Sequence, residues 1–291
     1  MPATLQAALL GIVQGLTEFL PVSSSAHLIL ARTFFGFDAD RFGLAFDVAC
    51  HVGTLIAVLI FFHREVGQMI RSLPRVFSPE AALSNAGPPE PQKGPGSAAD
   101  ENNQGARLVW LLVIGTIPAV VVGLLFNTVI EEHMRVPQVA AVALAVGAIL
   151  FFVAERVGTK TRSDRSLTMA EAFWLGCAQA LALVPGVSRS GVTIAVALFM
   201  GLRRTDAARF IFLLAIPAIL AAAANEGLKV FKTGLDAGAV TLFMIGIVTS
   251  AIVGYVAIRF CIRYFANHSL DVFAWYRLAL AGAVVVWLMR V

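Results

Sequence analysis

Long apolar segments constrain this chain more than any other feature of its sequence. A helix needs about 20 predominantly apolar residues to cross the hydrocarbon core of a bilayer. Of the 291 residues, 58% are hydrophobic and only 14% are charged, whereas a soluble domain carries about 25% charged residues. The sequence therefore predicts an all-α, polytopic membrane protein, because α-helices satisfy their own backbone hydrogen bonds in lipid. Six segments qualify as spans: 44–63, 107–126, 138–154, 206–225, 239–260 and 272–289.

Two further apolar stretches are interrupted by short polar runs that begin at a proline. Residues 5–35 are interrupted by Pro-Val-Ser-Ser-Ser-Ala-His at 21–27, hereafter the first break. Residues 167–200 are interrupted by Pro-Gly-Val-Ser-Arg-Ser at 185–190, the second break. Each stretch is typical of a short helix, a polar turn and another short helix, which predicts a re-entrant helical hairpin.

The two interrupted stretches resemble one another. Gly, Gln, Leu and Pro occur at positions 11, 14, 16 and 21 of the first and at 176, 179, 181 and 185 of the second. Three spans follow each stretch, and because three is odd the second copy must lie upside down relative to the first. We therefore expect one membrane domain of about ten helices, built from two inverted repeats (1–154 and 155–291), whose interrupted segments meet inside the membrane.

The basic residues predict how the spans are oriented. Cytoplasmic loops carry the excess of Lys and Arg, and most of these residues, such as Arg156, Arg203 and Arg263, fall on one side of the predicted topology. That side is predicted to be cytoplasmic, with both termini outside. Segment 74–105, rich in Pro, Gly, Ser and Asn, is predicted to be a disordered cytoplasmic linker. The net charge of +4 speaks for topology rather than for a nucleic-acid partner.

The second break has the composition of an oxyanion receptor. Non-helical backbone at membrane depth must be buried in protein or line a wet cavity, and an ionisable group there indicates a functional site. Arg189 offers a fork of donors suited to phosphate, and the N–H groups of a helix start bind anions. Three hydroxyls accompany it, on Ser188, Ser190 and Thr193. In the alternative interpretation, the hydroxyls cap a helix and Arg189 pairs with a buried carboxylate such as Glu18.

The first break, with the helix that precedes it, contains residue types that can take part in catalysis. His27 is a candidate general acid or base, and either Ser23 or Ser24 could be a nucleophile if His27 activates it. Glu18 could hold a divalent cation or accept a proton, and Gln14, on the same helix face, could add a neutral oxygen ligand. In the alternative interpretation, His27 caps a helix and Glu18 is structural. Together the two breaks favour phosphoryl transfer or hydrolysis.

Three polar residues elsewhere are less specific. Asp47 and His51 are one turn apart at the start of a span and face either the same cavity or the solvent at the helix end. Arg277 lies within the last predicted span and needs a buried partner, which is either a bound anion or a carboxylate.

The polar breaks also resemble a known family. QGLTEFLPVSSSAH (14–27) and PGVSRSGVT (185–193) closely resemble the two signature blocks of bacterial undecaprenyl-diphosphate phosphatases of the bacitracin-resistance type. FDVACHVGTL (46–55) and WYRLALAG (275–282) also resemble segments of this family. The resemblance therefore runs along essentially the whole chain apart from the predicted linker.

The resemblance implies a function and a set of site residues. Members hydrolyse undecaprenyl diphosphate to the monophosphate and inorganic phosphate, which recycles the lipid carrier for cell-wall polymers and confers bacitracin resistance. They depend on a divalent cation such as Mg²⁺ or Ca²⁺, and their active site faces the outer leaflet of the cytoplasmic membrane. The family's first motif is Glu or Gln, three residues, then Glu; Gln14 and Glu18 fill it here, with one anionic oxygen fewer than two glutamates would supply.

The same resemblance assigns roles residue by residue. A homodimer is possible, and the sequence leaves the oligomeric state open. The residues implied to line the catalytic centre are Glu18, Ser23, Ser24 and His27. Those implied to bind the diphosphate are Ser188, Arg189, Ser190 and Thr193, with Arg277 as a helper.

The sequence excludes one other class of lipid phosphatase and leaves one rival class open. The acid-phosphatase-like lipid phosphatases carry a His six positions after the Arg of a Ser-Arg pair, and that place holds Ala195 here, which excludes them. A transporter is the main rival, because inverted repeats with broken helices are also a transporter architecture. Whether a serine or an activated water attacks the phosphorus is left open by the sequence.

Overall fold

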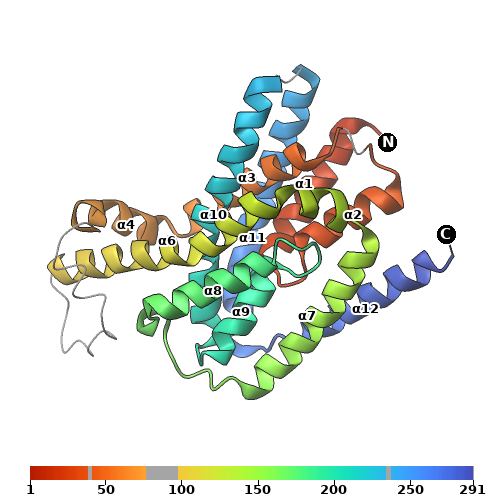
Figure 1. The fold of residues 1–291 in the computed structure, drawn as a ribbon. Coiled ribbons are helices and arrows are strands. Elements are labelled where there is room, and N and C mark those ends of the chain that lie inside the picture. The colour runs from red at the N-terminus through yellow and green to blue at the C-terminus, as the bar shows by residue number, and fades with distance from the viewer. Residues whose placement is uncertain (39–40, 77–97, 234–236, 291) are drawn as a thin grey trace.

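The chain is helical throughout the residues that its computed structural model describes, 1–38, 41–76, 98–233 and 237–290 (Figure 1). The described residues contain one isolated β-bridge, between Arg162 and Leu202, and no strand. The predicted all-α fold class is therefore confirmed. Outside the two helical hairpins, the helices are α3 (Leu44–Phe61), α4 (His63–Val76), α6 (Ala98–Val129), α7 (Pro137–Val157), α10 (Arg204–Thr233), α11 (Ala237–Asn267) and α12 (Asp271–Leu288).

Six of these helices are long and apolar enough to cross a membrane. They are α3, α6, α7, α10, α11 and α12, and each coincides with one of the six predicted spans. Two of these spans were predicted slightly too long, because α3 ends at Phe61 and α12 at Leu288. The prediction for segment 74–105 is wrong at both ends. Residues 74–76 belong to α4, and 98–105 belong to α6, which begins at Ala98, nine residues before the predicted span 107–126. The remainder of that segment, 77–97, lies outside the described residues.

Both interrupted stretches form helical hairpins, as predicted. The first consists of α1 (Ala3–Phe19) and α2 (Ser24–Phe35), and the second of α8 (Met169–Leu181) and α9 (Arg189–Phe199). In both hairpins the second helix begins inside the polar break, because a serine there caps its N-terminus. The breaks lie side by side at the centre of the molecule (Figure 1).

Small residues let the hairpins pack deeply against the spans. A Cβ placed on Gly15 of α1 would lie only 2.7 Å from the Ser250 carbonyl oxygen of α11. Gly11, one turn earlier, faces Gly246 of α11 in the same way. Such close backbone contact is how membrane helices gain packing energy without a hydrophobic driving force between them.

The packing is reciprocal between the two halves of the chain. Helix α1 of the first hairpin packs on α11, and α8 of the second packs on α6. The last helices of the two halves, α7 and α12, run side by side (Figure 1). Each hairpin thus packs on a span from the other half of the chain.

Candidate active site

Two serines with unusual backbone conformations shape the breaks. Ser23 has φ 76° and Ser188 has φ 73°, in the left-handed region that a non-glycine residue seldom adopts. Each hydroxyl accepts a hydrogen bond from the helix that follows, Ser23 from the Ala26 amide at 3.4 Å and Ser188 from the Gly191 amide at 3.2 Å. Backbone strain of this kind costs about 1–3 kcal/mol per residue and clusters at functional sites. Each of these serines thus caps the N-terminus of the helix that follows it, α2 or α9.

The breaks also contact one another directly. The Gly186 amide donates to the Ser25 hydroxyl at 3.4 Å, and the Ser190 hydroxyl donates to the Leu20 carbonyl at the same distance. Because each contact joins residues more than 150 positions apart, tertiary packing and not local sequence holds the two breaks together.

Arg277 of α12 ties both breaks to α7. Its guanidinium is fully buried and donates at 3.0–3.3 Å to carbonyl oxygens of both breaks and of α7. The acceptors are Pro21, Gly186, Val187, Ala143 and Leu144. It also lies 5.0 Å over the Phe151 ring. The structure therefore places Arg277 among backbone carbonyls, and neither of the two partners considered from the sequence, a bound anion or a carboxylate, is needed.

Glu18 lies at the centre of the site, with three hydrogen-bond donors and the ring of His51 around it. Its side chain is 4% exposed. Oε2 accepts hydrogen bonds from Ser24 Oγ at 2.7 Å and from Gln14 Nε2 at 2.9 Å, and lies 3.4 Å from His51 Nε2. Oε1 accepts from Arg189 Nη2 at 2.9 Å. Arg189 is thus paired with Glu18, the carboxylate that the alternative interpretation of the second break named, and the Ser24 hydroxyl connects this pair to the first break.

His51 is the site residue that sequence reasoning left outside its candidate set. Its Nδ1 donates to the Asp47 carbonyl oxygen at 2.7 Å, which directs Nε2 toward Glu18. The Asp47 carboxylate binds two arginines, Arg32 and, at 2.6 Å, Arg135. Two signals in the sequence pointed to it: the one-turn spacing of Asp47 and His51, and the family-like block 46–55 that contains them.

His27 and Thr193 are hydrogen-bonded to groups other than Glu18. His27 Nδ1 donates to the Ser23 carbonyl and Nε2 accepts from the Tyr276 hydroxyl, both at 2.7 Å. The Thr193 hydroxyl donates to the Arg189 carbonyl at 2.5 Å, one turn back in its own helix. The structure brings neither side chain into contact with Glu18: His27 is held at the edge of the first break, and Thr193 stabilises the first turn of α9.

Gln14 carries an oxygen suited to a cation. Its Oε1 is buried and has no hydrogen-bond partner, while its Nε2 donates to Glu18. Among the residues that the structure describes, no three His, Cys, Asp or Glu side chains cluster as a ligand set. One carboxylate and one amide oxygen fit a hard cation such as Mg²⁺, which takes few protein ligands and completes its shell with water and substrate phosphate oxygens.

Fold and site together define a class: an integral membrane protein that presents a guanidinium, hydroxyls and two helix N-termini around one buried carboxylate, an arrangement suited to a phosphorylated ligand. The chain belongs to the family described as bacitracin resistance protein BacA, whose family model matches residues 7–283.

Curated relatives of the same length support this membership. The chain is 46% identical to an undecaprenyl-diphosphatase of Rubrobacter xylanophilus, over 98% of both chains. It is 43% identical to one of Thermomicrobium roseum, over 94% of both chains. A third, from Trichlorobacter lovleyi, is 39% identical over 99% of this chain and 97% of its own.

Proposed function

We propose that this protein is a membrane phosphatase that hydrolyses undecaprenyl diphosphate to undecaprenyl phosphate and inorganic phosphate. The family membership and the relatives named undecaprenyl-diphosphatase support this activity. This hydrolysis recycles the lipid carrier used in cell-wall synthesis. The recycling in turn confers resistance to bacitracin.

The observation that carries the proposal is the contact between Arg189 and Glu18. It joins the two polar breaks, 171 positions apart, into one buried site. A diphosphate that enters this site meets the guanidinium of Arg189, the hydroxyls of Ser188 and Ser190 and the start of α9. Preorganised donors aimed at developing negative charge are the main source of catalysis in phosphoryl transfer.

In the proposed reaction Ser24 is the nucleophile and Glu18 is its base. Ser24 Oγ already donates its proton to Glu18 Oε2 at 2.7 Å, within the range required for proton transfer. As Ser24 Oγ bonds to the terminal phosphorus, the bond from that phosphorus to the bridging oxygen breaks and undecaprenyl phosphate leaves. The proton passes to Glu18. Water then cleaves the phosphoserine and releases inorganic phosphate.

Direct attack by water is the second route, and it uses the same base. His51 supports either route, because its Nε2 lies 3.4 Å from Glu18 Oε2 and can share the proton that Glu18 receives. His27 is proposed to act at a distance: its ring fixes the Ser23 carbonyl, and so positions the residue that precedes Ser24. This replaces the role of serine-activating base that the sequence suggested for His27.

A divalent cation, Mg²⁺ or Ca²⁺, is proposed to bind at Gln14 Oε1 and Glu18. The support is the buried, unpartnered Oε1 of Gln14, whose amide nitrogen donates to the Glu18 carboxylate. When bound, such a cation would neutralise charge on the phosphate oxygens. The residues of the chain then orient the substrate: Arg189 holds the terminal phosphate and Ser24 is aligned by its hydrogen bond to Glu18.

The protein is proposed to reside in the bacterial cytoplasmic membrane as a single domain of two inverted repeats, 1–154 and 155–291. Both termini are proposed to lie outside and the active site to open toward the outer leaflet. The reciprocal packing of α1 on α11 and α8 on α6 supports the repeats, and the distribution of basic residues supports the orientation. The homodimer stays a prediction.

The proposal is tested by phosphate release from undecaprenyl diphosphate by purified wild-type protein. Arg189→Ala and a chelator are the comparisons, and Arg259→Ala, an exposed residue of α11, is the matched control. We expect release that is lost with Arg189→Ala and with chelator but kept in the control. Folded wild-type protein that releases no phosphate, yet moves the lipid between the leaflets of a vesicle, would instead identify a transporter.

A further inference from the structure

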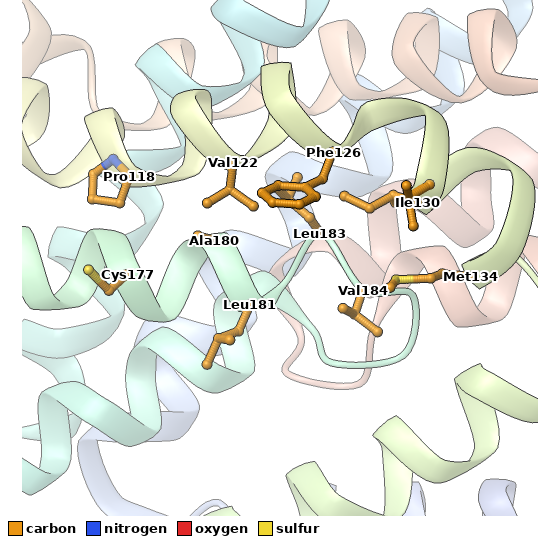
Figure 2. A pocket seen from close by; sticks show the side chains of 11 residues that line it. Pro118, Val122, Phe126, Ile130, Met134, Cys177, Ala180, Leu181, Leu183 and Val184 are labelled. Atoms are coloured by element: carbon orange, nitrogen blue, oxygen red, sulfur yellow. The ribbon is translucent and has the colours of Figure 1, made fainter.

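An apolar groove lies beside the active site, between α6, the π-helical segment η1 (Ile130–Met134) and the end of α8. Its volume is about 360 Å³, within the range of about 300–1,000 Å³ of small-molecule pockets. Figure 2 shows Val122 and Phe126 of α6 above it, Met134 at one end, and Cys177 and Ala180 of α8 below. Every side chain that lines it is apolar.

Both walls of the groove lead into the polar site. Val184, in the lower wall, is followed at once by the second break, which carries Arg189. Tight turns make this connection compact: the amides of Leu183, Val184 and Val187 donate to carbonyl oxygens three residues earlier, at 3.2 Å. Five residues span at most about 18 Å even when fully extended, so the end of the groove at Val184 is near Arg189.

The opposite wall leads to the other side of the same site. Met134 is followed by Arg135, whose guanidinium binds the Asp47 carboxylate at 2.6 Å. Asp47 is one turn from His51, which faces Glu18. A molecule lying in the groove therefore has the polar site at one end, bounded by residues from both walls.

We propose that this groove binds the isoprene units nearest the diphosphate of the substrate. The inference rests on the proposed function, because it requires a substrate that joins an anionic group to a polyprenyl chain. The polar site matches only the charged end of such a molecule, and the groove supplies the adjoining apolar surface that the chain requires. Phe126 and Leu181 at its rim are 52% and 61% exposed, so the chain continues from the groove into the lipid.

Cys177 provides a probe of this site in the wild-type protein. Cys177 lines the groove and is partly exposed, whereas Cys50 and Cys261 are fully buried. N-ethylmaleimide should therefore modify Cys177 first in the folded protein. A farnesyl bisphosphonate, whose P–C–P bridge is not hydrolysed, is expected to slow this modification several-fold, and methylene bisphosphonate without a prenyl chain is expected to leave it unchanged.

Two results of this experiment would overturn the inference. One is that the farnesyl compound does not change the rate at which Cys177 is modified. A rate that is slow with and without the compound, because a bilayer lipid occupies the groove, counts as this result. The other is equal protection by both bisphosphonates, which would place the effect in the anion site. Neither result bears on the proposed function, which fails only if wild-type protein releases no phosphate from undecaprenyl diphosphate.

A substitution in the floor of the groove gives an independent test. Ala180 is 9% exposed and lines the groove, and Ala170, near the start of the same helix, is exposed to its surroundings. Ala180→Phe is expected to raise the KM for farnesyl diphosphate at least about tenfold with kcat little changed, the pattern of lost ground-state binding. Ala170→Phe should change neither constant.

The changes in KM and kcat show whether Ala180→Phe affects substrate binding in the groove or the reaction in the active site. An unchanged KM in folded Ala180→Phe, or a fall in kcat alone, would contradict the inference. If Ala180→Phe does not fold, the smaller Ala180→Val replaces it, and the protection of Cys177 still tests the site without any substitution.

Discussion

Arg277→Lys is expected to destabilise the fold strongly, because Arg277 binds five backbone carbonyls at once. Those carbonyls belong to both breaks and to α7. A guanidinium offers five N–H donors in a fixed fork, whereas an ammonium offers three. At least two of the five carbonyls therefore lose their donor in the lysine variant, in a region where Arg277 itself is 0% exposed.

The magnitude follows from the number of acceptors left unpaired. A buried polar group without its partner costs about 1–3 kcal/mol, so two of them lower the free energy of unfolding by roughly 2–6 kcal/mol. Part of the loss falls on the active site, since three of the acceptors, Pro21, Gly186 and Val187, lie in the breaks.

The free energy of unfolding is measured by titrating wild-type and variant protein in mild detergent with sodium dodecyl sulfate. Arg259→Lys is the matched control, since Arg259 is an exposed arginine of α11, and it should change the free energy by less than about 0.5 kcal/mol. An Arg277→Lys variant as stable as wild type, but with a raised KM for the diphosphate, would refute the reasoning and return Arg277 to the role of anion ligand.

The remaining predictions concern the reacting groups. Arg189→Ala should lower kcat by at least about 10²-fold, since one well-placed donor is worth a few kcal/mol in the transition state; near-normal turnover of the folded variant would contradict its role. Ser24→Ala should abolish a burst of phosphate transfer to protein in rapid-quench experiments, whereas a burst-free wild type with an active Ser24→Ala variant would favour attack by water. Gln14→Glu should reduce the cation concentration that gives half-maximal activity, because it adds an anionic oxygen beside Glu18; an unchanged concentration would place the cation elsewhere.

The spans and the polar breaks depend on residues that are close together in the chain, and they were predicted correctly from the sequence. The spans could be read because each helix must be apolar along its own length to lie in lipid. The breaks could be read because Pro21 and Pro185 interrupt the helical pattern, and the serines that follow are natural helix caps. The error at segment 74–105 has the same origin: polar residues such as Asn102 and Asn103 resemble a linker in composition, although tertiary contacts extend α6 through them.

The assignment of site residues was harder, since it depends on which way a side chain points. Ser24, Arg189 and Glu18 were named from their residue types, and they do meet. His27 and Arg277 were named for the same reason, yet one is held by Tyr276 and the other by backbone carbonyls. Residue type reveals which groups need a partner but not which partner is in reach.

The sequence by itself thus determined three properties: that the protein is embedded in a lipid bilayer, how many spans it has, and where the two polar breaks lie. These properties follow from hydrophobicity and capping, which act over a few residues. Only the tertiary structure decided that Glu18 faces Arg189, that His51 joins them from α3, and that Arg277 is part of the framework. Those contacts join different helices, and they form only when the two hairpins pack against each other and against α3, α7 and α12.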